Sequence, residues 1–379
     1  MNAETQIISD DALWVVSLLN WYRANKREMP WRDDPSPYKT WVSEIMLQQT
    51  QVATVIPYFN RFIRTFPSIQ ALADADMDAL LKQWEGLGYY SRARNLKKTA
   101  KLVCEDFGGK LPENYNDLQC LPGIGPYCAA AITSIAFGHP VPVVDGNVLR
   151  VFSRFWGIFD DIRLKTVRDT LFLKLERYIQ DANPADFNQA MMECGALICT
   201  PKSPSCQDCP LHRHCFAYQF QKTEQLPFKS KLAPAPHHTI GIGIIFHQNK
   251  IFISKRREEQ MLGGLWEFPG GKKEKKESIR ETVRREIKEE TQLDVVVETK
   301  LCEVKHAYSH FKITLHAYFC TLLDREKKLL PLTTESLKVE AEEYRWVELE
   351  KLENFAFPTA NKKVIHALKK KALMPSLLT

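Results

Sequence analysis

Four cysteines crowded into one short stretch constrain this 379-residue chain more than any other feature. The spacing is Cys-x6-Cys-x2-Cys-x5-Cys, formed by Cys199, Cys206, Cys209 and Cys215. The N-terminal residues MNAETQIISDDALW lack the basic and apolar segments of a signal peptide, so a metal site is more plausible than a disulfide framework. Four thiolates at this density suit a tetrahedral zinc ion or a cubane iron–sulfur cluster.

The hydrophobic pattern changes along the chain. Residues 10–220 have apolar positions three and four apart, which predicts helices. Residues 226–237 hold three prolines and little periodicity, as a linker does. The runs beyond it predict strands at 239–246, 250–254, 295–304 and 311–323, a helix at 277–291 and a final helix at 362–371. We therefore predict a multi-domain protein: an all-α domain over 1–225, a linker over 226–237 and an α+β domain over 238–379.

Composition narrows the function less than the motifs do. The net charge of +6, from 52 basic and 46 acidic residues, permits binding to a polyanion without demonstrating it. No apolar run approaches the roughly 18–20 residues that cross a bilayer. We expect an intracellular, cytoplasmic monomer without a membrane partner, associated with the nucleoid if the source is bacterial. A nucleic-acid function must be argued from motifs.

A glycine turn followed by an aspartate is the first such motif. In LPGIGPYCAAAI, at 121–132, Gly123 and Gly125 would let backbone N–H groups approach a phosphate closely. A plain corner between two helices is the alternative. Asp145 follows twenty residues after Gly125, in the run Val-Asp-Gly-Asn-Val. It could carry chemistry or merely cap a helix.

The segment WVSEIMLQQTQV, at 41–52, contains a candidate acid. We expect it to be helical, with Glu44 among the apolar side chains of Ile45, Met46 and Leu47. Burial of a carboxyl raises its pKa and suits it to general acid catalysis. A capping or surface glutamate is the alternative interpretation.

Taken with further segments, these motifs resemble the adenine DNA glycosylases of the MutY kind, within the endonuclease III superfamily. The resemblance covers essentially the whole chain, and its other matches are Arg27, the runs Met29-Pro30-Trp31-Arg32 and Leu47-Gln48-Gln49-Thr50-Gln51, residues 86–92 and residues 187–190. It implies a helix–hairpin–helix at about 115–133. It also implies that the four cysteines of the loop 199–215 hold a [4Fe–4S] cluster.

The resemblance also implies roles for the catalytic residues. Glu44 would protonate adenine, and Asp145 would stabilise an oxocarbenium-like sugar, with Tyr127 and Asn147 holding the sugar and Asp145. Members that also cut the DNA backbone carry a lysine at the position of Tyr127. A phenol cannot form their Schiff base, so we predict a monofunctional enzyme that leaves an abasic site.

The implied partner is double-stranded DNA with adenine opposite 8-oxoguanine or guanine. Arg27 and Trp31 would line the adenine pocket, and Gly123 and Gly125 would contact the DNA backbone. Because the adenine must leave the base stack, Gln49 and Tyr89 would fill the gap and wedge the duplex. Ordinary helix polarity for Gln49 and a core tyrosine for Tyr89 are the alternatives.

Residues 271–293 resemble the Nudix pattern, with Gln292 as the only departure, in place of a glycine. Glu286, Glu289 and Glu290 fall at i, i+3 and i+4, so they share one helix face that could bind Mg²⁺. A solvated amphipathic helix is the alternative. The resemblance implies that this domain recognises 8-oxoguanine.

The run His306-Ala307-Tyr308-Ser309-His310 is similar to the family's Phe-Ser-His lesion-reading loop, with Tyr in place of Phe. Ser309 and His310 would hydrogen-bond the lesion, although a plain hairpin turn is the alternative. Two other functions remain open. One is a Nudix nucleotide pyrophosphohydrolase fused to a DNA-binding domain. The other is an inactive DNA-binding protein, which the presence of both Glu44 and Asp145 argues against.

Overall fold

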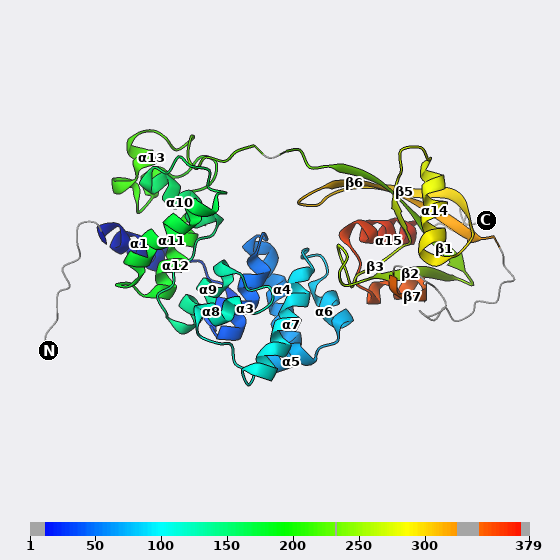
Figure 1. Ribbon diagram of the computed structural model, residues 1–379, viewed down its shortest axis with the longest axis horizontal. Helices are drawn as coiled ribbons and strands as arrows, with labels where there is room; N and C mark the ends of the chain where they lie inside the picture. Colours follow the sequence, from blue (N-terminus) through cyan, green and yellow to red (C-terminus); the bar gives the residue numbers. More distant parts are fainter. Residues whose placement is uncertain (1–11, 232, 324–340, 373–379) are drawn as a thin grey trace. The chain divides into compact units, whose positions relative to one another are not determined.

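The computed structural model describes residues 12–231, 233–323 and 341–372 (Figure 1). Within them the chain divides into two compact units. The helical unit comprises residues 12–74 and 95–231. The C-terminal unit comprises the rest, together with residues 75–94, which come from the helical part of the sequence. No helix in the described ranges is long and apolar enough to cross a bilayer.

The described part of the helical unit contains helices and no strand, as its 3.6-residue periodicity predicts. Polar N-cap side chains start several of the helices; Ser36, Asn114, Asp145 and Asn183 each accept a hydrogen bond from a backbone N–H of the first turn. The helices are α1 (Leu13–Asn25), α2 (Pro30–Asp33), α3 (Pro37–Leu47), α4 (Val52–Thr65), α5 (Ile69–Asp74), α7 (Ser91–Asp106, which begins in the other unit), α8 (Tyr115–Gln119), α9 (Pro126–Phe137), α10 (Gly146–Trp156), α11 (Lys165–Ile179), α12 (Pro184–Leu197) and α13 (Phe216–Gln219).

Helix α12 lies at the centre of this unit and packs against α1, α9 and α10. Its Phe187 and the Phe152 side chain of α10 are both fully buried and both contact Trp14 of α1. A glycine allows α12 and α10 to approach closely, since a Cβ at Gly195 would lie 2.6 Å from the Cβ of Asn147. This packing fixes the start of α10, where Asp145 and Asn147 lie.

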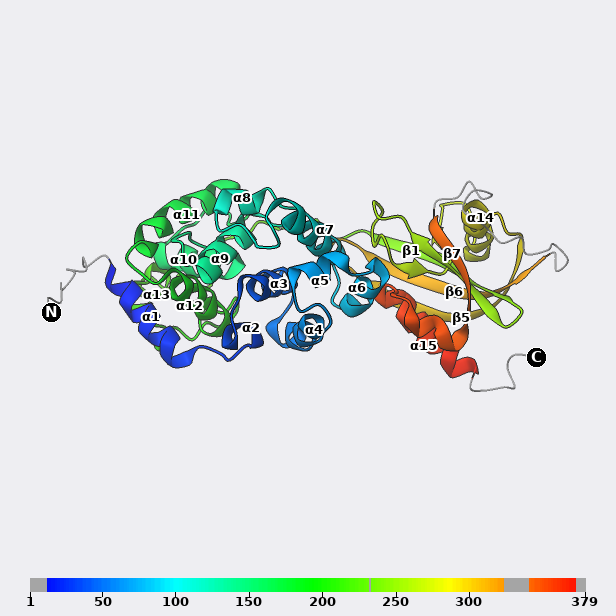
Figure 2. The same ribbon diagram turned by 90° about the horizontal axis from the view of Figure 1, so that it is seen from below.

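The described strands of the C-terminal unit form one mixed sheet in the order β3-β2-β1-β6-β5, in which β4 pairs with β1 and β7 with β2. Helices α14 and α15 cover opposite faces of this sheet (Figures 1 and 2). The elements are β1 (His237–His247), β2 (Lys250–Arg256), β3 (Trp266–Glu267), β4 (Gly270–Lys272), α14 (Ile279–Thr291), β5 (Val295–Ala307), β6 (Lys312–Leu322), β7 (Ala341–Glu348), the 3₁₀ helix η4 (Leu349–Asn354) and α15 (Thr359–Ala372), and the same unit includes α6 (Met77–Trp84).

Two local predictions need correction. The segment 41–52 is not one helix, because α3 ends at Leu47 and Gln49 adopts a left-handed backbone with φ of 55°. The N–H of Thr50 closes the turn on the carbonyl of Leu47 before α4 begins. In the C-terminal unit, the strands β3, β4 and β7 were not predicted; β3 and β4 have only two and three residues and so show no alternation.

Candidate functional site

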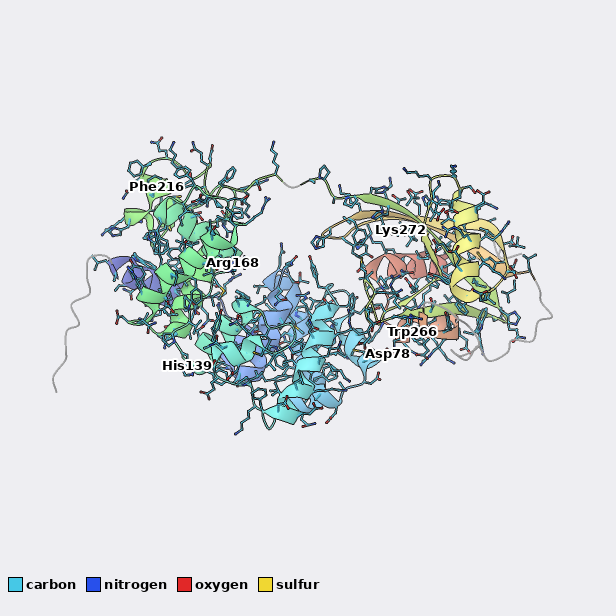
Figure 3. The ribbon with its side chains drawn as sticks, in the orientation of Figure 1. Asp78, His139, Arg168, Phe216, Trp266 and Lys272 are labelled. Carbon is cyan, nitrogen blue, oxygen red and sulfur yellow. The ribbon has the colours of Figure 1, made fainter. Side chains whose placement is uncertain are left out.

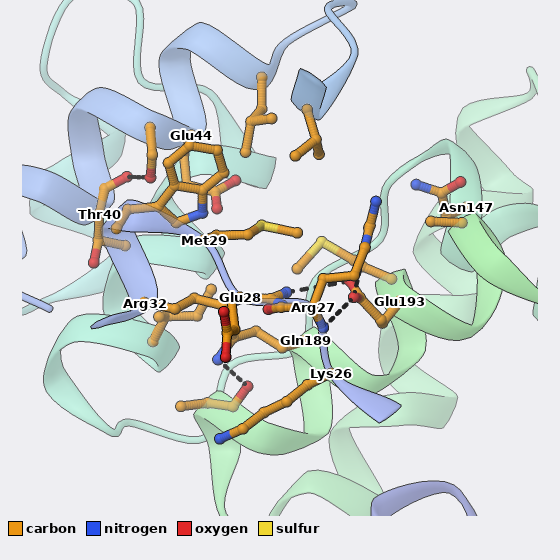
Figure 4. Close-up of a pocket in the computed structure, with 18 of the residues that line it drawn as sticks. Lys26, Arg27, Glu28, Met29, Arg32, Thr40, Glu44, Asn147, Gln189 and Glu193 are labelled. Atoms are coloured by element: carbon orange, nitrogen blue, oxygen red, sulfur yellow. Dashed lines mark hydrogen bonds and ion pairs between the residues drawn. The ribbon is translucent and has the colours of Figure 1, made fainter. Parts of the chain in front are cut away.

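The helical unit encloses a cavity of about 910 Å³, bordered by the loop after α1 and by α2, α3, α9, α10 and α12 (Figure 4). Six predicted site residues line it: Arg27, Trp31, Glu44, Tyr127, Asp145 and Asn147. They come from segments as far apart in sequence as residues 27 and 147, and the helix packing brings them together.

Glu44 is 5% exposed and faces this cavity from α3. Burial raises its pKa to about 7, and the charge of Asp145 acts in the same direction. The phenol of Tyr127 donates a hydrogen bond of 2.6 Å to Glu44 Oε2, which lowers the pKa and partly offsets burial. Glu44 therefore has the protonation behaviour of a general acid near neutral pH.

Asp145 is the N-cap of α10 and also lines the cavity. Its Oδ1 accepts the N–H of Val148 at 2.7 Å, and its Oδ2 accepts the side-chain amide of Asn147 at 2.8 Å. Burial raises the pKa of Asp145, and these two donors oppose that rise by favouring the anion. The sequence left open whether Asp145 caps a helix or takes part in chemistry. The two roles are compatible, because this carboxyl faces both the start of α10 and the cavity.

The arginine at the cavity rim is held by a glutamate that the sequence reasoning did not identify. Arg27 binds Glu193 through Nε at 2.7 Å and through Nη2 at 2.9 Å, and Arg32 contacts the same carboxylate at 3.3 Å (Figure 4). Burial would raise the pKa of Glu193, but the two arginines outweigh it and lower the pKa. Trp31 packs edge-on against Phe59, so its ring is fixed as well.

The glycine turn joins α8 to α9, as the sequence predicts. Gly123 has φ of 79°, and a Cβ there would lie 2.7 Å from the side chain of Asn95, so conformation and space both require glycine. Gly125 is the N-cap of α9 without a side-chain cap, and no atom lies within 4 Å of where its Cβ would be. Gly125 and Pro126 are exposed at the start of this twelve-residue helix, and the N-terminus of a helix is an element that can bind a phosphate.

The four clustered cysteines line one small cavity of about 20 Å³, together with Arg154 and His212. Two single-turn 3₁₀ helices, η2 (Cys206–Asp208) and η3 (His212–His214), bend the loop around it. The buried Arg154 donates to Cys199 Sγ at 3.3 Å and to backbone carbonyls of this loop. Among the described residues, no three side chains form a group that could hold a single metal ion.

The C-terminal unit has a second cavity of about 390 Å³, lined by Glu267, Glu286, Glu290 and Asn361 among others. Burial raises the pKa of Glu290 to about 8, and the adjacent Glu267 adds to the rise. Glu289 does not line the cavity; it contacts Arg285, which also binds Glu277 and Glu286. The structure therefore brings only two of the three predicted glutamates together at this cavity.

Gln292, the departure from the Nudix pattern, is the C-cap of α14 and has φ of 58°. Glycine adopts this left-handed conformation without strain, so the usual glycine is explained by backbone geometry and not by contact with a ligand.

The remaining predicted residues lie on exposed turns. Ser309 and His310 form the exposed tip of the hairpin between β5 and β6, and Tyr308 stacks on Phe311 behind them. Ser309 shares a hydrogen bond with the hydroxyl of Tyr89, in the loop after α6. Gln49 is exposed in the turn after α3 and does not line the catalytic cavity.

Comparison with known proteins identifies relatives of both units. A family model described as the HhH-GPD superfamily of base excision DNA repair proteins matches residues 42–177, and a NUDIX domain model matches residues 241–367. An adenine DNA glycosylase of Buchnera aphidicola subsp. Schizaphis graminum is 39% identical over 300 residues, which are 79% of this chain and 84% of that protein. The human adenine DNA glycosylase is 35% identical over 407 residues, 92% of this chain and 72% of that protein.

Among solved structures, a thermostable thymine-DNA glycosylase superposes with a TM-score of 0.51 and 28% identity, covering 55% of this chain and 96% of that one.

Proposed function

The chain belongs to the adenine DNA glycosylase family, enzymes of base excision repair that remove adenine, and from this premise we propose how its two units share the work. The helical unit cleaves the N-glycosidic bond of adenine in duplex DNA, and the C-terminal unit reads the 8-oxoguanine or guanine opposite. The observation that carries the first part is the buried Glu44, with a pKa near 7, in the same cavity as Asp145.

Glu44 supplies the proton that makes adenine a good leaving group. An adenine anion leaves the sugar poorly, whereas protonation of a ring nitrogen lets the base depart as a neutral molecule. With a pKa of about 7, about half of the Glu44 carboxyls hold a proton at neutral pH. The hydrogen bond from Tyr127 occupies Oε2, so the transferable proton resides on Oε1.

Asp145 stabilises the sugar once the bond breaks. Positive charge develops at C1′, and a carboxylate held by Val148 and Asn147 is oriented before the reaction begins. Water then adds its oxygen to C1′ and releases a proton, which restores the acid form of Glu44. The products are free adenine and an abasic site.

Tyr127 determines what happens to the abasic site. A primary amine at this position could attack C1′ and lead to strand cleavage through a Schiff base. The phenol cannot, and its hydroxyl is engaged with Glu44. The strand therefore stays intact.

Recognition of the base is assigned to Arg27 and Trp31. The Glu193 carboxylate fixes the guanidinium of Arg27, and Phe59 fixes the ring of Trp31. Both side chains are therefore held in place before the base enters. Gly123 and Gly125 present backbone N–H groups to a DNA phosphate, and Gln49 and Tyr89 support the opened duplex.

The cysteine loop fits a [4Fe–4S] cluster. Cys199, Cys206, Cys209 and Cys215 border one cavity, and the guanidinium of Arg154 supplies positive charge beside the Cys199 sulfur. When bound, the cluster would cross-link the loop as a redox-capable anionic centre. Arg154 would hold the loop against α10 through its hydrogen bonds to the carbonyls of Thr200 and Pro201.

The lesion is read by Ser309 and His310. Both are exposed at the tip of one hairpin, and the stack of Tyr308 on Phe311 stiffens that hairpin. Their hydroxyl and imidazole can hydrogen-bond the edge of 8-oxoguanine. We propose that the protein acts as a monomer on cellular double-stranded DNA.

Single-turnover cleavage of three duplexes tests this function. Adenine lies opposite 8-oxoguanine, guanine or cytosine, and each product is analysed with and without hot alkali. We expect strand breaks only after alkali, and faster reaction opposite 8-oxoguanine than opposite guanine. Breaks without alkali would contradict the role of Tyr127, and equal rates for all three duplexes would contradict lesion reading.

A second candidate activity is Mg²⁺-dependent hydrolysis of a nucleoside triphosphate in the C-terminal cavity. It is favoured by Glu286 and Glu290, whose carboxyls line that cavity and could hold the ion. The test is release of phosphate or pyrophosphate from 8-oxo-dGTP with Mg²⁺, comparing the protein with Glu290→Gln and with Glu44→Gln as the matched control. Release that is absent, or equal in all three proteins, would eliminate this candidate.

A further inference from the structure

Residues 75–94, which include α6 and the loop that carries Tyr89, pack with the C-terminal unit although they end 139 positions before the rest of it begins at Ala233 (233 − 94). Polar contacts hold them there at several points. The Nη1 of Arg94 donates to the carbonyl of Gly263 at 2.6 Å, and the ammonium of Lys82 donates to the carbonyl of Phe355 at 3.1 Å.

The first buried contact is an ion pair. The ammonium of Lys255, on β2, lies 2.7 Å from the Asp78 carboxylate, and only 11% of the Lys255 side chain is exposed. The same ammonium lies 5.8 Å from the centre of the Trp266 ring; Asp78 and Trp266 are labelled in Figure 3. The Asp78 side chain is 35% exposed, so the cost of losing the pair falls mainly on the more buried ammonium of Lys255, from which Asp78→Lys removes a negative partner.

The second buried contact is made by Glu85, directly after α6. Its side chain is 8% exposed and accepts the backbone N–H of Phe357 at 3.0 Å and the ammonium of Lys362 at 3.0 Å. Burial would raise its pKa, yet hydrogen bonds from Lys82, Phe357 and Lys362 outweigh it and lower the pKa. The end of α6 is therefore fixed to the start of α15 by a carboxylate that stays ionised.

The loop between α6 and α7 is rigid in itself. Gly86 and Gly88 have positive φ, which glycine adopts without strain, but Tyr89 has φ of 49°, a conformation that a tyrosine keeps only where the surroundings enforce it. The indole N–H of Trp84 donates to the carbonyl of Gly88 at 3.0 Å, and Nη2 of Arg92 donates to the same carbonyl at 3.1 Å. Rigidity in the loop and in its two anchors fixes Tyr89 relative to the hairpin that carries Ser309.

We propose that residues 75–94 act as part of the lesion-reading unit, so that the wedge Tyr89 and the reader Ser309 reach DNA as one body. Asp78 and Glu85 are then positioning residues for specificity, which act through Lys255, Phe357 and Lys362. This inference rests on the proposed lesion reading by Ser309. Its consequence is that opening of the duplex at adenine is coupled to recognition of 8-oxoguanine.

Charge reversal across the buried pair tests the coupling. The proteins are Asp78→Lys, Lys255→Asp and the double variant. Each is assayed in single turnover on adenine opposite 8-oxoguanine and opposite guanine, and by the fluorescence of 2-aminopurine at the target position. We expect the rate of each single variant opposite 8-oxoguanine to fall about tenfold and its rate opposite guanine to stay the same. The rise in 2-aminopurine fluorescence that reports opening of the duplex should also be lost opposite 8-oxoguanine. The double variant should recover both.

A merely structural role predicts that the rates on both substrates fall by the same factor, so that their ratio stays constant. That result would overturn the proposal. Lys351→Glu, at an exposed pair elsewhere in the unit, is the matched control. If Lys255→Asp does not fold, Lys362→Glu makes the same test at a side chain that is 47% exposed.

Ser309→Ala separates this inference from the function on which it rests. If Ser309→Ala leaves the ratio of the two rates unchanged, lesion reading by the hairpin is wrong. If Ser309→Ala lowers the ratio while the charge reversals do not, lesion reading stands and only the coupling through residues 75–94 is wrong.

Discussion

Both units enclose a cavity lined by carboxyls, and the donors to Glu44 and Asp145 in the first differ from the donors to Glu286 and Glu267 in the second. In the helical unit, Glu44 accepts from a phenol and Asp145 accepts from an amide and a backbone N–H. In the C-terminal unit, Arg285 binds three glutamates, and Arg256 binds Glu267. The pair Glu44 and Asp145 therefore has neutral donors and Glu286 has a cation, although arginines also hold Glu193 in the first cavity and a backbone N–H holds Glu290 in the second.

Burial and the donor together decide which carboxyl can carry a proton, since burial raises the pKa of Glu267 and of Glu286 although an arginine binds each of them. Hydrogen bonds from Arg285 lower the pKa of Glu277 to about 2, so it is a fixed anion at any physiological pH. A neutral donor cannot cancel the effect of burial, and the pKa of Glu44 stays near 7. Glu290 behaves like Glu44, since it accepts a hydrogen bond from the N–H of Gly270 and its pKa is about 8. Neutral donors keep a buried carboxyl reactive.

The largest effect on the rate is expected when the acidic proton of Glu44 is removed. Glu44→Gln keeps the shape and a hydrogen-bond acceptor for Tyr127 but has no acid, so the single-turnover rate should fall about 10³-fold. Gel-shift affinity for the adenine:8-oxoguanine duplex should stay within about threefold, because no charged DNA contact is removed. A rate within tenfold of the unchanged protein would mean that another group donates the proton.

Replacing the neutral donor of Glu44 with a cation should cost somewhat less. Tyr127→Lys places an ammonium beside Glu44, which lowers the pKa of that carboxyl and should slow adenine release about 10²-fold. The amine should also form a Schiff base with the abasic sugar, which borohydride traps as a protein–DNA adduct. An unchanged rate at pH 7 would show that the neutral character of the donor is unimportant.

A smaller effect is a shift in pH dependence. A general acid works in its protonated form, so the rate should fall as pH rises through about 7. Tyr127→Phe removes the hydrogen bond that lowers the pKa of Glu44, so the descending limb should move to higher pH. Rates from pH 5.5 to 9 measure it, and a shift to lower pH would contradict the assignment. The stability of the fold should depend on pH in the same direction. Because the native pKa of Glu44 is raised, its contribution to the free energy of unfolding is fully present below the ordinary pKa of 4.5 and is lost as pH rises through about 7.

The smallest effect is expected in the C-terminal cavity. The native pKa of Glu290 is raised to about 8, so its stabilising contribution is present at low pH and is lost as pH rises through 8. Glu290→Gln lacks this titration and should melt about 3 °C higher than the unchanged protein at pH 9, with little difference at pH 5. Adenine release should be unaffected; a tenfold loss would show that the cavity takes part in catalysis.

The sequence predicts the parts of this molecule that depend on local periodicity or on a signature. The helical and α+β halves follow from the change in hydrophobic spacing, and the cavity residues Glu44, Tyr127, Asp145 and Asn147 were identified before their contacts were known. The burial of Glu44 followed from its apolar neighbours. Its direct contact with Tyr127 did not, because the resemblance associates Tyr127 with the sugar and Asp145.

Residues that act through distant partners escaped prediction. Glu193 lies only a few positions after the matched run 187–190, but nothing local marks it as the acceptor for Arg27. The packing of residues 75–94 with the C-terminal unit depends on Asp78 and Glu85, ordinary helix carboxylates until their partners are seen. Glu289 was predicted to join Glu286 and Glu290 but does not line their cavity. Helix periodicity places the three on one face and does not show that Glu289 binds Arg285.

The capping role of Asp145 has a consequence for how inherited variants would be classified. Because this carboxyl begins α10, replacing it with alanine removes about 1 kcal/mol of helix stability as well as the catalytic anion. Such a protein would be degraded faster in cells, since a loss of this size can change abundance several-fold. Asparagine at this position would preserve the cap and the protein level while abolishing the charge. Screens that score abundance alone would therefore flag the first variant and miss the second.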